Sequence, residues 1–299
     1  MNETPGFRIV SIVLGMIGLL AVPLLSQEGR AAAGRRQGIN DPFSEMDRAL
    51  SALENDISPE DEYYMGRAVG ANILELYRPY AGNHDLSVYL NLICRSLALH
   101  AAGPAPFNGY HVMILDSPEP NAFATPGGHI FISLGLVEAA ASEDMLAAVI
   151  AHEMAHIQLK HGIEMIRDNR LIRDLRELAD RSGEIAFRNA GLEVRRLFFV
   201  DAVKEIVDAM TINGFSQQQE FEADSLAVSL LASAGYEPSS LMDILYVLEK
   251  IPAGRSGGIL KTHPPALLRI SNVERALRKY PVHDTRSFRS ARFNALRYW

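Results

Sequence analysis

The segment AVIAHEMAHIQLKHG, residues 148–162, constrains the fold of this chain more than any other segment. On an α-helix, His152 and His156 are separated by about 400° of rotation and about 6 Å of rise, so both imidazoles leave the same face. Two imidazoles so placed can bind one metal ion, and Glu153, about 100° further round, lies beside the open coordination position. A separate apolar stripe at helical spacing predicts that this helix is buried in the core. The stripe consists of Leu146, Ile150, Met154 and Ile157.

The His-Glu-x-x-His pattern needs a third ligand before it indicates a catalytic metal site. Such a match is expected by chance in on the order of one chain of this length in a hundred. A catalytic zinc site uses three protein ligands and one water, so a further donor must come from elsewhere in the chain.

The candidate lies in residues 213–236, NGFSQQQEFEADSLAVSLLASAGY, where Ser216 can cap a helix. Glu220 and Asp224 are four residues apart and share a helical face, whereas Glu222 points the other way. We therefore predict that Glu220 is the third ligand and that Asp224 accepts a hydrogen bond from a ligating histidine. An acidic, solvated helix is the alternative interpretation, and the histidine pair favours ligation.

Composition indicates one folded domain with a small appendage. The chain has 299 residues, 48% hydrophobic and 22% charged, which is enough for a substantial core. A net charge of −7 argues against nucleic acid as a partner. The single cysteine, Cys94, excludes an intrachain disulfide and a cysteine-based zinc site, and we expect a buried, inert thiol.

The N-terminal region carries an uncharged apolar stretch of 17 residues, IVSIVLGMIGLLAVPLL, residues 9–25. We predict that residues 1–33 are a signal peptide cleaved after Ala33, or an anchor barely long enough to span a bilayer. Pro23 and the short length favour the signal. In either case the remainder is expected in the periplasm or on the extracytoplasmic face of the membrane, with membrane association only through this segment.

The pattern along the chain predicts an α+β, helix-dominated fold with a small sheet beside the histidine helix. Residues 34–57 are predicted to be a linker, and residues 58–280 are predicted to form the folded domain. The basic segment 281–299 is expected to be a solvated tail without a function; its arginines are Arg286, Arg289, Arg292 and Arg297. Strands are predicted at 110–116 and 129–135, joined by a long loop. Helices are predicted from Ser58 to Tyr80, and at 85–101, 143–161, 164–189, 192–212, 216–234, 238–250 and 265–279.

Four ordered motifs resemble the zinc metallopeptidase family that includes HtpX, the CAAX prenyl endopeptidases and the periplasmic β-barrel assembly-enhancing protease. They are HEMAH, SQQQEFEAD, NAFATPGGHIFISLGLVE and THPPALLR, and the similarity runs from about Glu60 to Leu277. The chain departs from the family's serine-arginine opening of the glutamate motif, with Gln217 after Ser216. This position lies outside the expected metal ligands.

The resemblance implies one Zn²⁺ per chain, held by His152, His156 and Glu220, with Glu153 as general base and acid. It further implies that His263 and Arg269 steady the oxyanion during hydrolysis. Because His263 follows a glycine-rich segment, it could instead occupy the position of the water and give a closed resting state.

Asn121 and the strand that contains GGHIFISLG are expected to form the platform for an extended substrate, because such substrates add to exposed strand edges. A purely structural hairpin strand is the competing interpretation. His129 and His161 are expected to be solvated or hydrogen-bonded to ligands rather than ligands themselves.

The expected activity is hydrolysis of peptide bonds in misfolded or stalled cell-envelope proteins, so the expected partners are unfolded or misassembled proteins. Residues 173–196, RDLRELADRSGEIAFRNAGLEVRR, carry too many charges for hydrocarbon, which favours a soluble or singly anchored enzyme. The alternative is a non-proteolytic chaperone or assembly factor on a zinc peptidase fold. Glu153 argues against it, because a structural metal site does not need that carboxylate.

Overall fold

The computed structural model describes residues 57–168, 204–251, 263–280 and 287–296, all within one compact unit, 42–299. The predicted signal or anchor and nearly all of the linker lie outside these residues, as do 169–203 and most of the two helices predicted there. The described helices are α3 (Pro59–Leu76), α4 (His84–Ala98), α5 (Leu134–Ala139), α6 (Glu143–Gln158), α7 (His161–Asp168), α10 (Gln217–Ser233), α11 (Ser240–Glu249), α13 (Ala266–Leu277) and α14 (Ser287–Leu296). The helix-dominated α+β prediction is confirmed, and no helix in the described ranges is long and apolar enough to cross a membrane.

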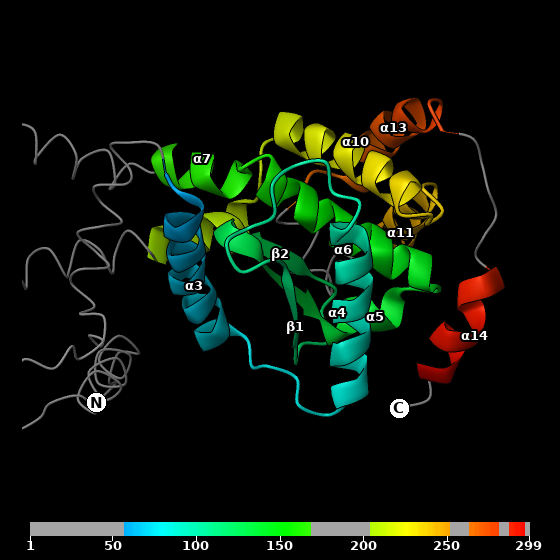
Figure 1. Cartoon of the computed structure of the whole chain (residues 1–299), viewed down its shortest axis with the longest axis horizontal. Coiled ribbons are helices and arrows are strands. Elements are labelled where there is room, and N and C mark those ends of the chain that lie inside the picture. The colour runs from blue at the N-terminus through cyan, green and yellow to red at the C-terminus, as the bar shows by residue number, and fades with distance from the viewer. Residues whose placement is uncertain (1–56, 169–203, 252–262, 281–286, 297–299) are drawn as a thin grey trace, which may run out of the picture. The chain divides into compact units, whose positions relative to one another are not determined.

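A small three-stranded sheet lies between α3 and α4 (Figure 1). Its order is β1 (His111–Leu115), β3 (His129–Ser133), β2 (Ala122–Thr125); β1 and β3 are parallel, whereas β2 and β3 are antiparallel. The prediction of one long loop between two strands is therefore wrong, because 122–125 pair with β3. The expected edge role of residues 129–135 is also wrong, since β3 is the central strand. β2 is paired on one side only among the described strands.

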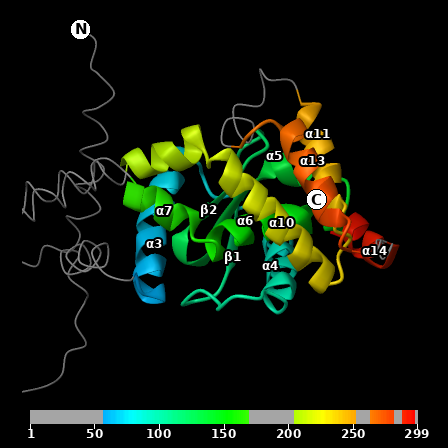
Figure 2. The same ribbon diagram turned by 90° about the horizontal axis from the view of Figure 1, so that it is seen from above.

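Helix α6 is the central helix of the described fold. Ser142 caps it by accepting a hydrogen bond from the Met145 backbone N–H, and the helix is buried over nearly all of its length. It packs against α10, α4, α11 and β2, and Figure 2 shows α10 lying across it. The predicted helix 143–161 ends early, because Lys160 adopts the left-handed backbone conformation (φ 60°) and α7 begins at His161. This break turns the chain sharply beside the histidine pair.

Helix α10 begins with a firmly capped first turn, and it presents Glu220 and Asp224 to α6. Ser216 and Gln219 form a reciprocal capping box. Ala223 and Ala227 are fully buried, and small side chains allow two helices to approach closely. The helices predicted at 216–234, 238–250 and 265–279 are confirmed as α10, α11 and α13.

Helix α3 lies directly against the turn that precedes β3. Its N-terminus has the predicted form, with Ser58 as cap, Pro59 in the first turn and Asp61 completing a capping box. Gly66 is needed where α3 crosses this turn, because a Cβ there would come 1.8 Å from the Pro126 carbonyl oxygen. A larger residue at this position would push α3 away from the sheet.

Cys94 lies within the larger of the two apolar clusters, which joins α4, the sheet, α6, α10, α11 and α13. Its side chain is fully buried, and burial raises the pKa of the thiol to about 12. The expectation of a buried, inert cysteine is confirmed.

Helix α14 overturns the expectation of a solvated basic tail for residues 287–296. Phe293 is buried in the larger cluster. Arg289 donates hydrogen bonds to Asp144 from Nε (3.0 Å) and Nη2 (2.6 Å). Arg292 binds Glu143 with the same bidentate geometry, from its own Nε and Nη2. The two acids begin α6 and are each 1% exposed. The sequence of this polar stretch could not predict that its arginines bind these two acids, because the acids lie about 145 residues earlier in the chain.

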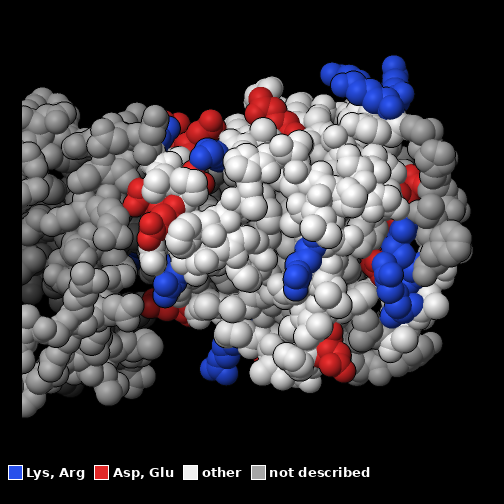
Figure 3. Space-filling view, in the orientation of Figure 1, with Lys and Arg blue, Asp and Glu red and all other residues white. Residues whose placement is uncertain are grey.

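Charged side chains are dispersed over the face drawn in Figure 3. Most of the described surface on this face is uncharged, and lysines, arginines, aspartates and glutamates occur as separate small groups. The described part of this face therefore offers no continuous basic path of the kind that follows a phosphate backbone.

Candidate active site

His152, His156 and Glu220 form a buried cluster where α6 meets α10. His152 Nε2 lies 3.1 Å from His156 Nε2 and 3.4 Å from Glu220 Oε2, and His156 Nε2 lies 3.5 Å from Glu220 Oε1. Ligand atoms about 2.0–2.1 Å from a tetrahedral zinc ion are about 3.3 Å apart. The two imidazole nitrogens and the Glu220 carboxylate thus already have about the spacing of ligands to one ion.

The chemistry of the donor set also fits a metal. Glu220 Oε2 is buried without a hydrogen-bond partner; Arg269 Nη1 lies 3.3 Å away but lacks hydrogen-bond geometry. A buried carboxylate oxygen without a partner is costly, and a cation among these atoms would satisfy it. Two imidazoles and one carboxylate are a common set of protein ligands for catalytic zinc.

Glu153 follows the first ligand on α6 and points into a narrow cavity beside β2. It is 1% exposed, and its Oε2 has no hydrogen-bond partner. Burial raises the pKa of its carboxyl above the usual range, which suits a group that must both accept and release a proton. The cavity is lined by Ala122, Phe123, Ala124, Glu153, Met210, Phe215 and His263.

Asp224 and Arg269 support the ligands from behind. Asp224 Oδ1 lies 3.1 Å from His152 Nδ1, the ring nitrogen that faces away from the cluster. Arg269 donates two hydrogen bonds to the same carboxylate, from Nε (3.0 Å) and from Nη2 (2.6 Å). Burial alone would raise the pKa of Asp224, but Arg269 and the hydrogen bond with His152 hold it below its usual value. Asp224 is therefore a charged acceptor that can fix the orientation of His152.

His263 comes from the segment before α13 and joins the ligand cluster. Its Nδ1 lies 2.7 Å from Glu220 Oε1, and the ring is buried. One donor atom from each of His152, His156, Glu220 and His263 can be chosen so that all four lie within 4.8 Å of one another. His263 is thus close enough to act at the metal or on a substrate bound there.

Phe215 and His161 complete the surroundings of His156; the sequence interpretation left His161 either solvated or hydrogen-bonded to a ligand, and it gave Phe215 no role. The Phe215 ring stacks on His156 with centroids 4.0 Å apart and an interplanar angle of 17°. His161 Nδ1 lies 2.9 Å from His156 Nδ1. No sequence signal marks Phe215, whereas of the two alternatives given for His161 the structure shows the contact with a ligand.

The structure does not bring Asn121 into the cavity. Asn121 is buried, its Oδ1 accepts from the Ala122 backbone N–H, and its own N–H donates to Ser133 Oγ. These bonds fix the start of β2. The cavity is lined instead by β2 residues 122–124, so the strand edge beside Glu153 belongs to β2.

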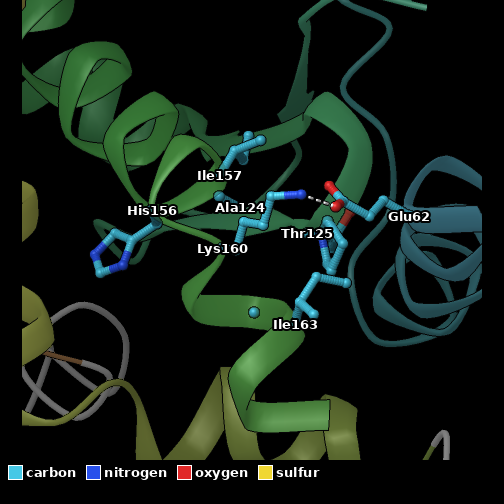
Figure 4. A pocket seen from close by; sticks show the side chains of 9 residues that line it. Glu62, Ala124, Thr125, His156, Ile157, Lys160 and Ile163 are labelled. Carbon is cyan, nitrogen blue, oxygen red and sulfur yellow. Dashed lines mark hydrogen bonds and ion pairs between the residues drawn. The ribbon is translucent and has the colours of Figure 1, made fainter. Parts of the chain in front are cut away.

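A second cavity lies on the other side of His156, between α3, β2 and α7 (Figure 4). The imidazole of His156 points away from it, while Lys160 and Glu62 form an ion pair across it. This cavity is therefore separate from the ligand cluster, and the ion pair joins α3 to the turn between α6 and α7.

Residues 88–277 match the model described as peptidase family M48. The chain belongs to peptidase family M48. The match includes both metal motifs and α13, so the His-Glu cluster, which could hold a metal ion, lies within the matched peptidase domain. The predicted resemblance to the zinc metallopeptidases is confirmed.

Curated relatives of this M48 chain are named as proteases. It is 26% identical over 230 residues to the mitochondrial metalloendopeptidase OMA1 of Schizosaccharomyces pombe, covering 74% of this chain and 62% of the relative. It is 25% identical over 241 residues to the beta-barrel assembly-enhancing protease of Escherichia coli K12, covering 79% and 47%. The OMA1 protein of Arabidopsis thaliana is 30% identical over 155 residues, covering 52% and 29%. The chain thus matches less than two thirds of the length of each relative.

Proposed function

We propose that this protein is a zinc-dependent endopeptidase. The observation that carries the proposal is the buried cluster of His152, His156 and Glu220 with the Glu153 carboxylate beside it. A purely structural metal site has no use for a buried, unpaired carboxylate next to the ligands. The family of the chain supports the same activity.

In this proposal each residue of the site has a separate task. A zinc ion held by His152, His156 and Glu220 would polarise the scissile carbonyl and lower the pKa of water towards ~7. Glu153 removes the proton from the attacking water and later delivers it to the leaving amine. Asp224 and Arg269 hold His152 and Glu220 in place, and Arg269 and His263 are the nearby groups suited to balance negative charge on the carbonyl oxygen.

We further propose that an extended substrate binds along β2. This strand has a sheet partner on one side only within the described fold, and its residues 122–124 line the cavity that contains Glu153. Main-chain pairing with a strand edge gives affinity without demanding a particular sequence. Such binding suits a peptidase whose substrates are unfolded chains.

The natural substrates that we propose are misfolded or stalled proteins of the cell envelope. One relative is named for enhancing β-barrel assembly, and the apolar stretch at residues 9–25 is of the kind that exports or anchors a chain. We therefore propose that the peptidase domain works in the periplasm or on the extracytoplasmic face of the membrane, with one zinc ion per chain.

Metal removal tests the activity directly. Dialysis against a chelator should remove about one zinc per chain and reduce casein cleavage by at least about 100-fold, because the ion supplies several kcal/mol of charge stabilisation. Added zinc should restore cleavage, whereas magnesium should not, since the donor set contains two imidazoles. Metal content and cleavage are measured on the same samples. Full cleavage by metal-free protein would refute a zinc peptidase.

His263→Ala separates the two roles open to this residue. If His263 closes the site at rest, as its Nδ1 within the ligand cluster, 2.7 Å from Glu220 Oε1, allows, its removal should open the site and raise basal casein cleavage several-fold. Initial rates at saturating zinc are the measurement. A fall in rate with unchanged zinc content would instead assign His263 to the carbonyl oxygen.

A further inference from the structure

A chain of hydrogen-bonding groups leads from the ligand His156 to the protein surface. His156 directs Nε2 into the cluster, and its Nδ1 lies 2.9 Å from Nδ1 of His161. Nε2 of His161 lies 3.4 Å from Glu222 Oε2. The residue His161 is 2% exposed, whereas the Glu222 side chain is 46% exposed. This series of side chains therefore begins at a buried ligand and ends at a carboxylate in contact with solvent.

The contact between two Nδ1 atoms permits only one proton between them. If His156 uses Nε2 as a neutral ligand, its remaining proton is on Nδ1, which must donate. His161 Nδ1 must then accept, so the proton of a neutral His161 is on Nε2, the nitrogen that lies 3.4 Å from Glu222 Oε2. The carboxylate of Glu222 favours this tautomer, because it can only accept.

The other ligating histidine is supported in a different way. His152 Nδ1 faces Asp224 directly, at 3.1 Å, and that carboxylate is fully buried and bound by Arg269. His156 has no carboxylate within such reach of its Nδ1 among the described residues. His161 occupies that place and connects His156 to an exposed carboxylate instead.

We propose that His161 and Glu222 are positioning residues for the metal ligand His156: His161 accepts the His156 Nδ1–H bond, and Glu222 selects the His161 tautomer that can accept it. Ligating histidines generally need such an acceptor to fix tautomer and ring orientation. The inference rests on metal binding at the proposed site and is independent of peptidase activity.

The local backbone places these groups beside the cluster. The left-handed turn at Lys160 ends α6 and begins α7, which brings His161 alongside His156. Phe215 contacts both rings, with centroids 4.0 Å from His156 and 5.9 Å from His161. Glu222 also accepts from Gln218 Nε2 at 2.6 Å, so its carboxylate is already held on the helix surface.

The test measures release of zinc from the loaded full-length protein into excess chelator. His161→Phe keeps the ring and removes the acceptor, and we expect release about 10- to 100-fold faster, the usual effect of losing a partner of a ligand. His161→Gln retains a carbonyl acceptor and should recover part of this loss. Glu222→Ala should accelerate release less than His161→Phe does, because water can replace an exposed carboxylate.

Glu164→Ala is the matched control, because Glu164 lies on α7 and accepts a hydrogen bond from Gln219, and it acts on His161 only as a nearby charge. The visible spectrum of the cobalt-substituted protein reports ligand geometry, and it should change in His161→Phe but not in Glu164→Ala.

Release of zinc at the wild-type rate from folded His161→Phe would overturn the proposal, as would an equal acceleration of release in Glu164→Ala. If His161→Phe does not fold, faster release from Glu222→Ala than from Glu164→Ala supports the proposal, and equal release overturns it. If the protein binds zinc but cleaves no substrate, the proposed peptidase activity is refuted, and the zinc-release test of His161 and Glu222 remains valid.

Discussion

Glu153→Gln should abolish peptide-bond cleavage and leave the protein folded and loaded with metal. The amide cannot remove a proton from water, and general acid–base catalysis contributes about 10²- to 10⁴-fold to rate. Since Glu153 is close in shape to glutamine and donates no ligand atom to the cluster, the fold and the metal site should persist. Casein cleavage, zinc content and the circular dichroism spectrum are measured together.

Glu164→Gln is the control for this prediction, since it makes the same chemical change at an exposed glutamate on α7. It should cleave casein at the wild-type rate. If Glu153→Gln and wild type rescue an unfolding client equally and neither cleaves it, the protein is a chaperone or assembly factor on a peptidase fold. Undiminished cleavage by Glu153→Gln would remove this residue from the mechanism.

Arg289→Ala should lower the free energy of unfolding by about 3 kcal/mol or more, the usual effect of removing one partner of a buried ion pair. Asp144 is 1% exposed and would retain one hydrogen bond, from the Glu237 backbone N–H. The variant also loses the contact of Arg289 with the Tyr236 ring and its bond to the Gly235 carbonyl. Urea unfolding monitored by circular dichroism gives the value.

A second substitution distinguishes the buried charge from the other lost contacts. Asp144→Asn removes the charge and keeps an acceptor for the Glu237 N–H, so Arg289→Met with Asp144→Asn should recover much of the lost stability. Arg275→Ala, at an exposed position on α13, should leave the urea midpoint unchanged. An unchanged midpoint in Arg289→Ala would show that the pair of Arg289 with Asp144 does not contribute to stability.

The metal site was predictable from sequence because its parts follow local rules. The i, i+4 spacing places His152 and His156 on one face of any helix, and a serine cap with spaced acids marks Glu220 and Asp224. The residues that were missed depend on contacts between distant segments. Residues 122–125 read AFAT and have no clear strand pattern, and only pairing with β3 makes them a strand.

The C-terminal arginines show the same limit. Nothing local distinguishes an arginine that will meet a buried carboxylate from one that will stay in solvent, because the distinction depends on which helix packs beside it. The break between the helices was predicted at 162–163 and lies at Lys160 instead, since a lysine gives no local signal of left-handed backbone, and this lysine forms an ion pair with Glu62 on α3. Where α7 begins depends on that turn.

The pairing of α14 with the start of α6 also orders events on the ribosome. Glu143 and Asp144 are synthesised about 145 residues before the arginines that neutralise them, and Glu220 likewise follows His152 and His156 in the chain. A nascent chain therefore exposes its histidine helix before either the third metal ligand or the arginines exist. The proposed metal site can therefore be completed only after Glu220 has been synthesised, and the acids at the start of α6 meet their arginines later still.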